Sequence, residues 1–254
     1  MQDRYVGDVG DYGKYGLLRL LSSPKPLGLG LLTGLVWYRV ANEEHNSDGR
    51  HIGYLKDPCY RACDPDLYDR LKAIVESPCR RIADVEIGGI LPDRTIFFSD
   101  ILTYSGIAPC DRLRHRRAWL DAALICTDTC QVVFLDPDNG IETPSCGPRT
   151  LKAPKYVLWS ELTQWAARPK TSLLVYHHLN RRAKATSQIS SMLARIRADL
   201  PNAQNVQALL FRKGSLRVFF IIPTDEHVSR IEWVIHNLTH GAWRHLFDDV
   251  GHLH

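Results

Sequence analysis

The stretch QVVFLDPDNGIE, Gln131–Glu142, places a run of mostly apolar, β-favouring residues directly before a polar turn. Gln131–Leu135 is expected to form a buried strand, because it is a short apolar run that turn residues terminate. The Asp, Pro, Asn and Gly that follow are the residues that build turns. They also suit an active-site edge, since parallel sheets bind ligands at the carboxyl ends of their strands. The rest of the sequence must decide between a plain turn and a site.

The composition favours a globular protein without membrane segments. An apolar fraction of 44% and a charged fraction of 24% over 254 residues allow a sizeable core. There is no run of about 18 apolar residues, so we expect no membrane-spanning helix and no membrane partner. The opening MQDRYVGDVGDYGKYG contains acidic residues and no apolar block, unlike a secretory signal. The seven cysteines, an odd number, favour reduced thiols, and the sequence therefore predicts a cytoplasmic protein.

Apolar periodicity predicts helices that alternate with strands along most of the chain. The predicted helices are Gly13–Leu21, Asp66–Glu76, Asp111–Thr127, Tyr156–Ala167, Arg182–Leu200 and Glu226–Leu238. The predicted strands are Leu29–Val40, Thr95–Phe98, Gln131–Leu135, Ser172–Tyr176, Asn205–Phe211 and Ser215–Ile222. This alternation predicts an α/β fold with a parallel sheet, and a turn at Arg212–Gly214 makes the last two strands a hairpin. Because no repeat or linker is visible, we expect a single domain over residues 1–254.

The second half, in the order strand, helix, strand, helix and hairpin, resembles the carboxyl half of the Rossmann-like S-adenosylmethionine-dependent methyltransferases. The resemblance implies a three-layer Rossmann-like sandwich, with a mostly parallel sheet and a C-terminal antiparallel hairpin. LDPDNG then follows the fourth strand, where enzymes that methylate amines of nucleic acid usually carry Asp or Asn, two prolines and an aromatic residue. Asp136 and Pro137 match this motif, whereas Asp138 and Asn139 replace its last two residues. The resemblance implies that these four residues are catalytic, aiming a carboxylate and a backbone carbonyl at the attacking amine.

The segment GDVGDYGKYGLLRLL, residues 7–21, is similar to the opening of the large-subunit ribosomal RNA adenine methyltransferases. That element reads Gly-Asn-x-x-Asp-Val-Leu-Lys-His in the family. Three of its positions match, Gly7, Asp11 and Lys14, and two differ, Asp8 and Tyr15. The resemblance implies that S-adenosylmethionine is the cofactor and that Asp11 and Lys14 lie near it.

Two further residues are expected on the cofactor side. Trp37, near the end of the first predicted strand, could form a stacking wall for an adenine ring or pack inside. Asp100 follows the second predicted strand, where a methyltransferase-like sheet implies an acidic side chain that binds ribose hydroxyls or the adenine amine. The alternative for Asp100 is that it caps the following segment. No GxGxG turn follows the first strand, so the cofactor pocket lacks the usual glycine-rich approach.

Positive charge is concentrated in three places, although the net charge is only +4. The clusters are Arg112, Arg114, His115, Arg116 and Arg117; Arg181, Arg182 and Lys184; and Arg149, Lys152 and Lys155. Each could be a solvated helix face, but their places near strand ends favour a nucleic-acid partner, either RNA or DNA. His178 and Arg181 are predicted on the substrate side. Neighbouring residues on a strand alternate sides, and His178 lies further past the strand end than His177.

Two other functions remain open from the sequence. A metal-dependent nuclease or phosphodiesterase would use Mg or Mn, and its ligands would be carboxylates and imidazoles that activate water. Its candidate residues are His45, Asp48, Asp136, Asp138 and His178. A non-catalytic protein of the same fold would bind a nucleotide without turnover, which the absent glycine-rich turn also allows.

Overall fold

The computed structural model describes residues 1–43 and 49–251 and shows the α/β architecture expected from the sequence. Within these residues a seven-stranded sheet has the order β2-β1-β3-β6-β8-β7-β9. Its strands are β1 (Thr33–Val36), β2 (Ile96–Phe98), β3 (Val132–Leu135), β6 (Ser172–His178), β7 (Gln207–Phe211), β8 (Arg217–Ile222) and β9 (Phe247–Asp249). Strands β2, β1, β3 and β6 are parallel, and β8 lies antiparallel between β6 and β7. The mostly parallel sheet with a C-terminal antiparallel hairpin is therefore confirmed.

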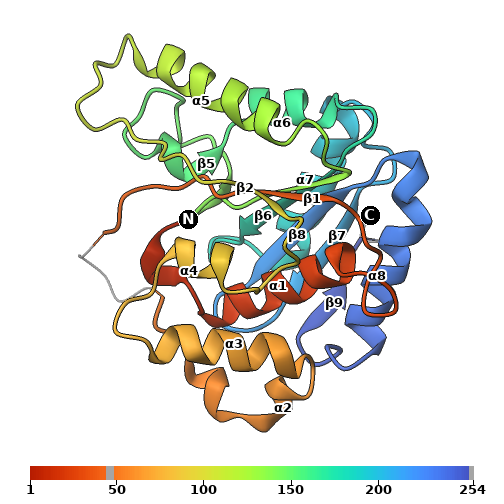
Figure 1. Cartoon of the computed structure of the whole chain (residues 1–254). Coiled ribbons are helices and arrows are strands. Elements are labelled where there is room, and N and C mark those ends of the chain that lie inside the picture. The colour runs from red at the N-terminus through yellow and green to blue at the C-terminus, as the bar shows by residue number, and fades with distance from the viewer. Residues whose placement is uncertain (44–48, 252–254) are drawn as a thin grey trace.

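Helices cover both faces of this sheet and make the molecule a three-layer sandwich (Figure 1). The helices are α1 (Val9–Ser22), α2 (Pro58–Arg61), α3 (Pro65–Glu76), α4 (Ile82–Ile87), α5 (Arg112–Cys126), α6 (Trp159–Ala166), α7 (Ala185–Asp199) and α8 (Val228–His240). Helices α1, α3, α4 and α8 pack on one face, and α5, α6 and α7 pack on the other. A small separate pair, β4 (Gly140–Ile141) and β5 (Tyr156–Val157), lies beside the main sheet.

The central strands are buried on both faces, as expected for the parallel part of a sheet. Along β3, Val132 and Phe134 contribute to the core beneath α1, while Val133 and Leu135 contribute to the core beneath α5 and α6. Successive side chains of a strand point to opposite faces, so one apolar run supplies both cores. This explains why β3 shows no polar alternation in the sequence.

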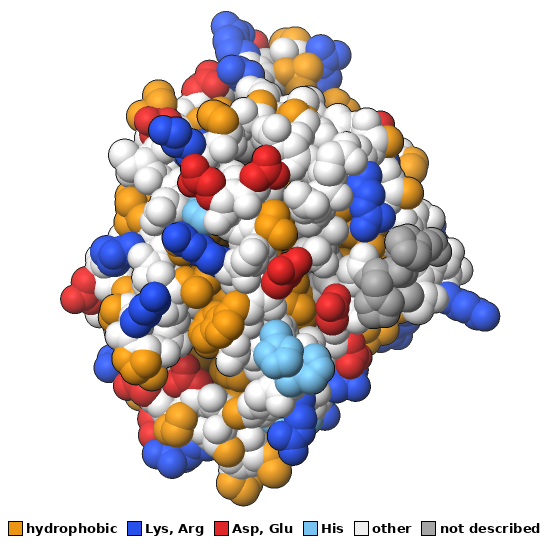
Figure 2. Space-filling model, turned by 90° about the vertical axis from the view of Figure 1, so that its right-hand side faces the viewer, with side chains coloured by type: hydrophobic (Ala, Val, Ile, Leu, Met, Phe, Trp, Pro, Cys, Tyr) orange, Lys and Arg blue, Asp and Glu red, His pale blue; other side chains and the backbone are white. Residues whose placement is uncertain are grey.

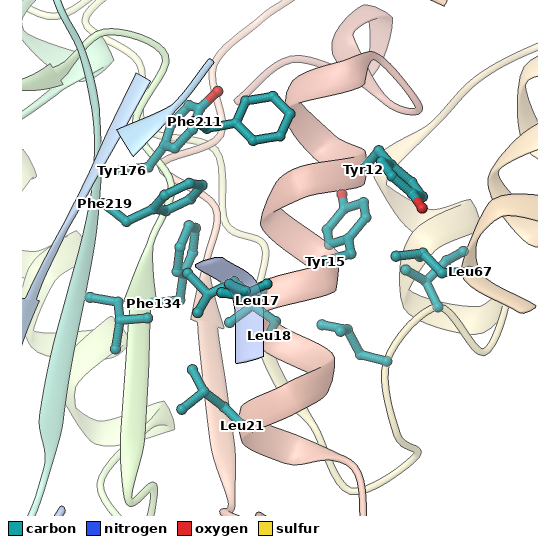
Figure 3. Packing of buried hydrophobic residues seen from close by; sticks show 14 of the residues in the cluster. Tyr12, Tyr15, Leu17, Leu18, Leu21, Leu67, Phe134, Tyr176, Phe211 and Phe219 are labelled. Carbon is teal, nitrogen blue, oxygen red and sulfur yellow. The ribbon is translucent and has the colours of Figure 1, made fainter. Parts of the chain in front are cut away.

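Helix α1 is the central element of the first core. Figure 3 shows its Leu17 and Leu21 directed toward Phe134 of the sheet, while Tyr12 points toward Leu67 of α3. Two glycines let neighbouring elements approach closely. A Cβ added at Gly13 would lie 2.4 Å from the Phe211 ring, and one at Gly16 would lie 2.4 Å from the Trp243 ring. Glycine weakens a helix interior, so its use here reflects the close packing of aromatic rings against α1.

Several element boundaries differ from the sequence predictions. The first strand is only Thr33–Val36, much shorter than Leu29–Val40 at both ends. Past its carboxyl end the regular strand conformation is interrupted at Tyr38, whose φ is 43°. Helix α1 begins four residues before the predicted Gly13, since the Asp8 side chain caps it. Strand β6 continues through His177 and His178, which pair with Val218 and Arg217 of β8.

Three further boundaries shift by fewer residues or reveal short elements. Helix α6 begins at Trp159, and the first residues of the predicted Tyr156–Ala167 helix form β5 instead. Helix α7 begins at Ala185, after an irregular segment. Strand β9 was not predicted. In the described part of the chain, no helix has the length and apolar character needed to cross a membrane.

Candidate functional site

A cavity of about 390 Å³ opens where β3 and β6 end, against the start of α1. Its wall comes from five parts of the chain: the opening residues with α1, the segment at residues 49–51, the turn after β3, the end of β6 with the loop that follows it, and the turn that leads into β8. The lining residues are Met1, Tyr5, Asp8, Asp11, Lys14, Gly49, His51, Asp136, Pro137, Asp138, Asn139, Tyr176, His178, Arg181, Gly214, Ser215 and Arg217. The cavity lies at the carboxyl ends of parallel strands, the usual place for ligands in open α/β sheets. Its volume falls in the range of small-molecule sites.

Lys14 joins two distant segments at the foot of this cavity. Its Nζ lies 2.8 Å from Asp11 Oδ1 and 2.8 Å from Asp136 Oδ2, and its side chain is 2% exposed. Burial alone would lower the pKa of Lys14, but the two carboxylates outweigh it and raise that pKa. Asp11 and Lys14 are three residues apart on α1, so helical geometry places them on one face.

The pKa of Asp136 depends on two opposing influences, its burial and the charge of Lys14. Burial is the main influence and raises its pKa to about 6, while Lys14 acts in the opposite direction. A carboxyl group with a pKa near the working pH can either hold or release a proton, as acid–base catalysis requires. Pro137 follows Asp136 and fixes the backbone as it leaves β3.

Asp138 and Asn139 complete the turn after β3, and both line the cavity. Asp138 Oδ1 lies 2.6 Å from the amino group of Met1, and its Oδ2 accepts a hydrogen bond of 2.6 Å from Gln2 Nε2. Burial would raise the pKa of Asp138, but that amino group and Gln2 lower it below the usual value. The Asn139 N–H donates to the Lys155 carbonyl at 3.0 Å. The Met1 amino group and the Gln2 side chain therefore hold the Asp138 carboxylate in place.

The two adjacent histidines of β6 face different layers. His177 Nδ1 accepts a hydrogen bond of 3.0 Å from the Ile141 N–H on the far side of the sheet, away from the cavity lining. His178 lines the cavity with Tyr176, their rings 5.1 Å apart. Burial, assisted by the Arg217 charge, lowers the pKa of His178 to about 3, so its imidazole is neutral at physiological pH. Arg181 reaches the same rim from the segment after β6.

The residues that line this cavity but were not predicted as site residues include Asp8, Tyr176, Ser215 and Arg217. Asp8 accepts hydrogen bonds from Gly10 N–H at 2.8 Å and Asp11 N–H at 3.0 Å, and it pairs with Arg217 Nη2 at 3.3 Å. An N-cap Asp before a helix is a recognisable sequence signal. So is a lone Arg217 at the start of the apolar run VFFII, because such a charge is buried only with a partner.

Two residues that were predicted on the cofactor side, Trp37 and Asp100, are not among the residues that line this cavity. Trp37 is fully buried, its Nε1 donates to Glu86 Oε1 at 2.8 Å, and its ring stacks on Phe97. Asp100 is exposed, and its carbonyl accepts a hydrogen bond from Trp119 Nε1. The ends of β1 and β2 are filled by protein side chains, so the open space lies at β3 and β6 instead.

The three basic clusters differ in their burial and in their ion pairs. Arg116 is buried and pairs with Glu161, so it does not belong to a binding surface. Lys155 pairs with Glu43 and lies 4.0 Å from Asp138. Arg181, Arg182 and Lys184 are exposed. Among the described members of the three clusters, Arg181 is the one that lines the cavity.

The described residues provide no set of metal ligands for the metal-dependent alternative. No group of three or more His, Cys, Asp or Glu side chains in residues 1–43 and 49–251 is arranged to hold a metal ion. Asp136 and Asp138 are each engaged by a cation. The other two candidate ligands, His45 and Asp48, lie outside the described residues. All seven cysteines are free thiols.

Comparisons with known proteins add no relative. The chain matches no protein-family model, no curated protein and no solved structure. The functional argument therefore depends on the cavity and its residues.

Proposed function

We propose that this protein is an S-adenosylmethionine-dependent methyltransferase that acts on an amine of nucleic acid, with adenine as the expected base. One observation carries the proposal: Lys14 and Asp136, 122 residues apart, are 2.8 Å apart at the foot of a cavity. These two residues come from the two segments that resemble the methyltransferases. A lysine from the opening element and an aspartate after the fourth strand of the pattern would meet in this way if both resemblances are genuine.

The sheet topology adds support. Strand β8 runs antiparallel to both of its neighbours, β6 and β7, and so completes a mostly parallel sheet in the way that the methyltransferase resemblance implied. Fold alone does not define an activity, since one fold hosts many functions. The cavity residues therefore carry the chemical part of the proposal.

The cavity residues fit the charged groups of S-adenosylmethionine. Arg217 Nε is buried and has no hydrogen-bond partner among the described residues, so it can donate to the carboxylate of the cofactor. Asp8 and Asp11 offer negative charge for its ammonium and sulfonium groups. Trp37 and Asp100 take no part in this arrangement. When bound, the cofactor supplies an electrophilic methyl group.

The residues around Asp136 would place the attacking amine. The Asp136 carboxylate, ionised above a pH of about 6, accepts a hydrogen bond from the amine and orients its lone pair. Pro137 keeps this carboxylate and the adjoining carbonyl in a fixed direction. The neutral imidazole of His178 can accept the proton that the amine releases once its new N–C bond has formed.

The test is transfer of a radiolabelled methyl group to total RNA and to total DNA. Asp136→Ala removes the oxygen that would accept the hydrogen bond of the amine, and we expect transfer to fall by about 100-fold or more because the amine loses its positioning partner. Asp121→Ala is the matched control, because Asp121 is half-buried on α5 and, among the described residues, pairs with Arg117. Undiminished transfer by Asp136→Ala would reject the assignment.

Binding of the cofactor is measured separately by calorimetry with the unmodified protein. Binding without any methyl transfer to RNA or DNA would favour the non-catalytic nucleotide-binding alternative. Absence of binding, together with stabilisation by Mn²⁺ or Mg²⁺ that Asp136→Asn abolishes, would favour the metal-dependent alternative.

A further inference from the structure

Two segments form one side of the cavity mouth. The loop at residues 179–184 follows β6, and the hairpin turn at residues 212–216 precedes β8. They lie side by side, because the Leu179 N–H donates to the Leu216 carbonyl at 3.2 Å and His178 pairs with Arg217. Arg181 from the loop, and Gly214 and Ser215 from the turn, line the cavity. Whatever these segments bind is therefore adjacent to the cavity.

Positive charge is unopposed on this side of the mouth. The two segments read LNRRAK and RKGSL and contain no acidic residue. Arg212 pairs with Asp248, but Arg181, Arg182, Lys184 and Lys213 are exposed and make no ion pair with a described carboxylate. We call these four side chains the cationic rim. On the face in Figure 2, Lys and Arg side chains are dispersed among Asp and Glu.

The volume of the cavity and the burial of Asp136 limit which groups can reach this residue. Asp136 is 1% exposed, and the cavity of about 390 Å³ has the size of a small-molecule site. A base stacked within a duplex cannot enter such a space, so enzymes that modify bases act on single strands or extrude the target base. A strand that supplies a base to Asp136 must then place its neighbouring phosphates beside the mouth.

We propose that the cationic rim binds the phosphate backbone of single-stranded nucleic acid, so that one unstacked base enters the cavity beside it. This inference rests on the proposed function for the identity of the base, but the binding itself needs no cofactor. Phosphate contacts hold a strand in position without reading its sequence, which agrees with four flexible cationic side chains. RNA and DNA share this backbone chemistry, and the experiment includes both.

The test measures binding of labelled single-stranded RNA, single-stranded DNA and duplex DNA by fluorescence anisotropy, without S-adenosylmethionine, over a series of salt concentrations. For the unmodified protein we expect single strands to bind more tightly than the duplex. The double variant Arg181→Gln/Arg182→Gln should bind single strands more weakly. It should also lower the slope of log K against log salt by about 1.4, since each phosphate contact in a single strand contributes about 0.7.

The matched control is Lys170→Gln/Arg230→Gln, which removes the same charge. Lys170 precedes β6 and Arg230 follows the end of β8, so both exposed side chains lie at the opposite edge of the sheet. An equal loss of affinity in both double variants would show that net charge alone explains the weaker binding. It would overturn the proposed role of the cationic rim. Duplex binding as tight as single-strand binding would also overturn it, and so would tighter binding to anionic lipid vesicles than to either strand.

The outcomes separate this inference from the proposed function. If the rim variant binds weakly but the unmodified protein transfers no methyl group, the rim stands and the methyltransferase proposal fails. If methyl transfer occurs and the rim variant binds strands as well as the unmodified protein, the methyltransferase proposal stands and the rim fails.

Discussion

Two buried ion clusters lie on opposite faces of the sheet, and they differ in whether they are closed. On the α5 and α6 face, the Arg116 guanidinium contacts both oxygens of Glu161 and donates to the carbonyls of Ala153 and Tyr156. Glu161 also accepts hydrogen bonds from the Leu158 N–H and the Tyr38 hydroxyl. On the α1 face, Lys14 contacts Asp11 and Asp136, and all three line a cavity.

The contrast shows that burial of charge does not by itself identify a site. In the Arg116 cluster, protein groups satisfy the ions and join α5 to α6, so the cluster holds the fold together. In the Lys14 cluster, the ions adjoin open space and unused groups, including Arg217 Nε and the Tyr176 hydroxyl, which makes no hydrogen bond with a described residue. The free hydrogen-bonding capacity beside the ions indicates a ligand.

The largest expected effect tests the closed cluster. Arg116→Met should lower the free energy of unfolding by about 3–5 kcal/mol, because it leaves the Glu161 charge buried without its cation. Urea denaturation measures the loss. Arg117→Met is the control, since Arg117 pairs with Asp121 at the exposed surface and should cost about 1 kcal/mol or less. Similar losses for the two variants would contradict the structural role of the Arg116 pair.

The open cluster should respond to the loss of its cation in a pH-dependent way. Lys14→Met leaves Asp136 buried without Lys14, so its pKa rises above about 6. The folded variant then binds a proton that the unfolded chain, with a carboxyl pKa near 4, does not bind. The stability deficit relative to the unmodified protein should therefore be large at pH 8 and shrink as the pH falls to 5.

Urea denaturation of Lys14→Met and of the unmodified protein at pH 5, 6.5 and 8 measures this change. The double variant Lys14→Met/Asp136→Asn is the control, because it cannot take up the proton at residue 136. A deficit in Lys14→Met that is constant with pH would show that Asp136 is not buried against Lys14 as described.

Activity should depend on the protonation of Asp136. In the proposed methyl transfer Asp136 acts in its ionised form, so we expect kcat/KM to fall by about tenfold per pH unit below a pH of about 6. His178, whose pKa is lowered to about 3, should contribute no step between pH 5 and 8. The measurement is a pH profile of kcat/KM. A flat profile between pH 5 and 7 would exclude an essential carboxylate with this pKa.

The sequence predicted the fold well because its signals are local. The apolar run Gln131–Leu135 predicts a strand, and its bounds nearly coincide with those of β3. The helical spacing of Asp66–Glu76 predicts a helix, and its bounds nearly coincide with those of α3. The first strand was predicted too long because its flanking residues are also apolar. Only the backbone turn at Tyr38 shows where β1 has already ended.

The site was predictable only in part, for a physical reason. Turn residues after a strand mark a sheet edge, which located Asp136, and the same logic located His178 and Arg181. The sequence carries a local signal that Arg217 is buried with a partner, but its place at this cavity depends on the pairing of β6 with β8, a contact between distant segments. For Trp37 the sequence left two alternatives open, because a strand end alone does not say whether tertiary packing fills the space beside it, and the structure shows its side chain buried.

The smallest expected effect compares one hydroxyl from each cluster. Tyr38→Phe removes the hydrogen bond of 3.2 Å to Glu161 and should cost about 1 kcal/mol of unfolding free energy. Tyr176→Phe removes a hydroxyl without a hydrogen bond to the described residues, so we expect a stability change within about 0.5 kcal/mol. The same substitution should instead weaken ligand binding, because Tyr176 lines the cavity. Urea denaturation and calorimetry of both variants measure the pair. If Tyr176→Phe loses stability but not ligand affinity, the cavity wall is a packing surface, and the contrast between closed and open clusters fails at this residue.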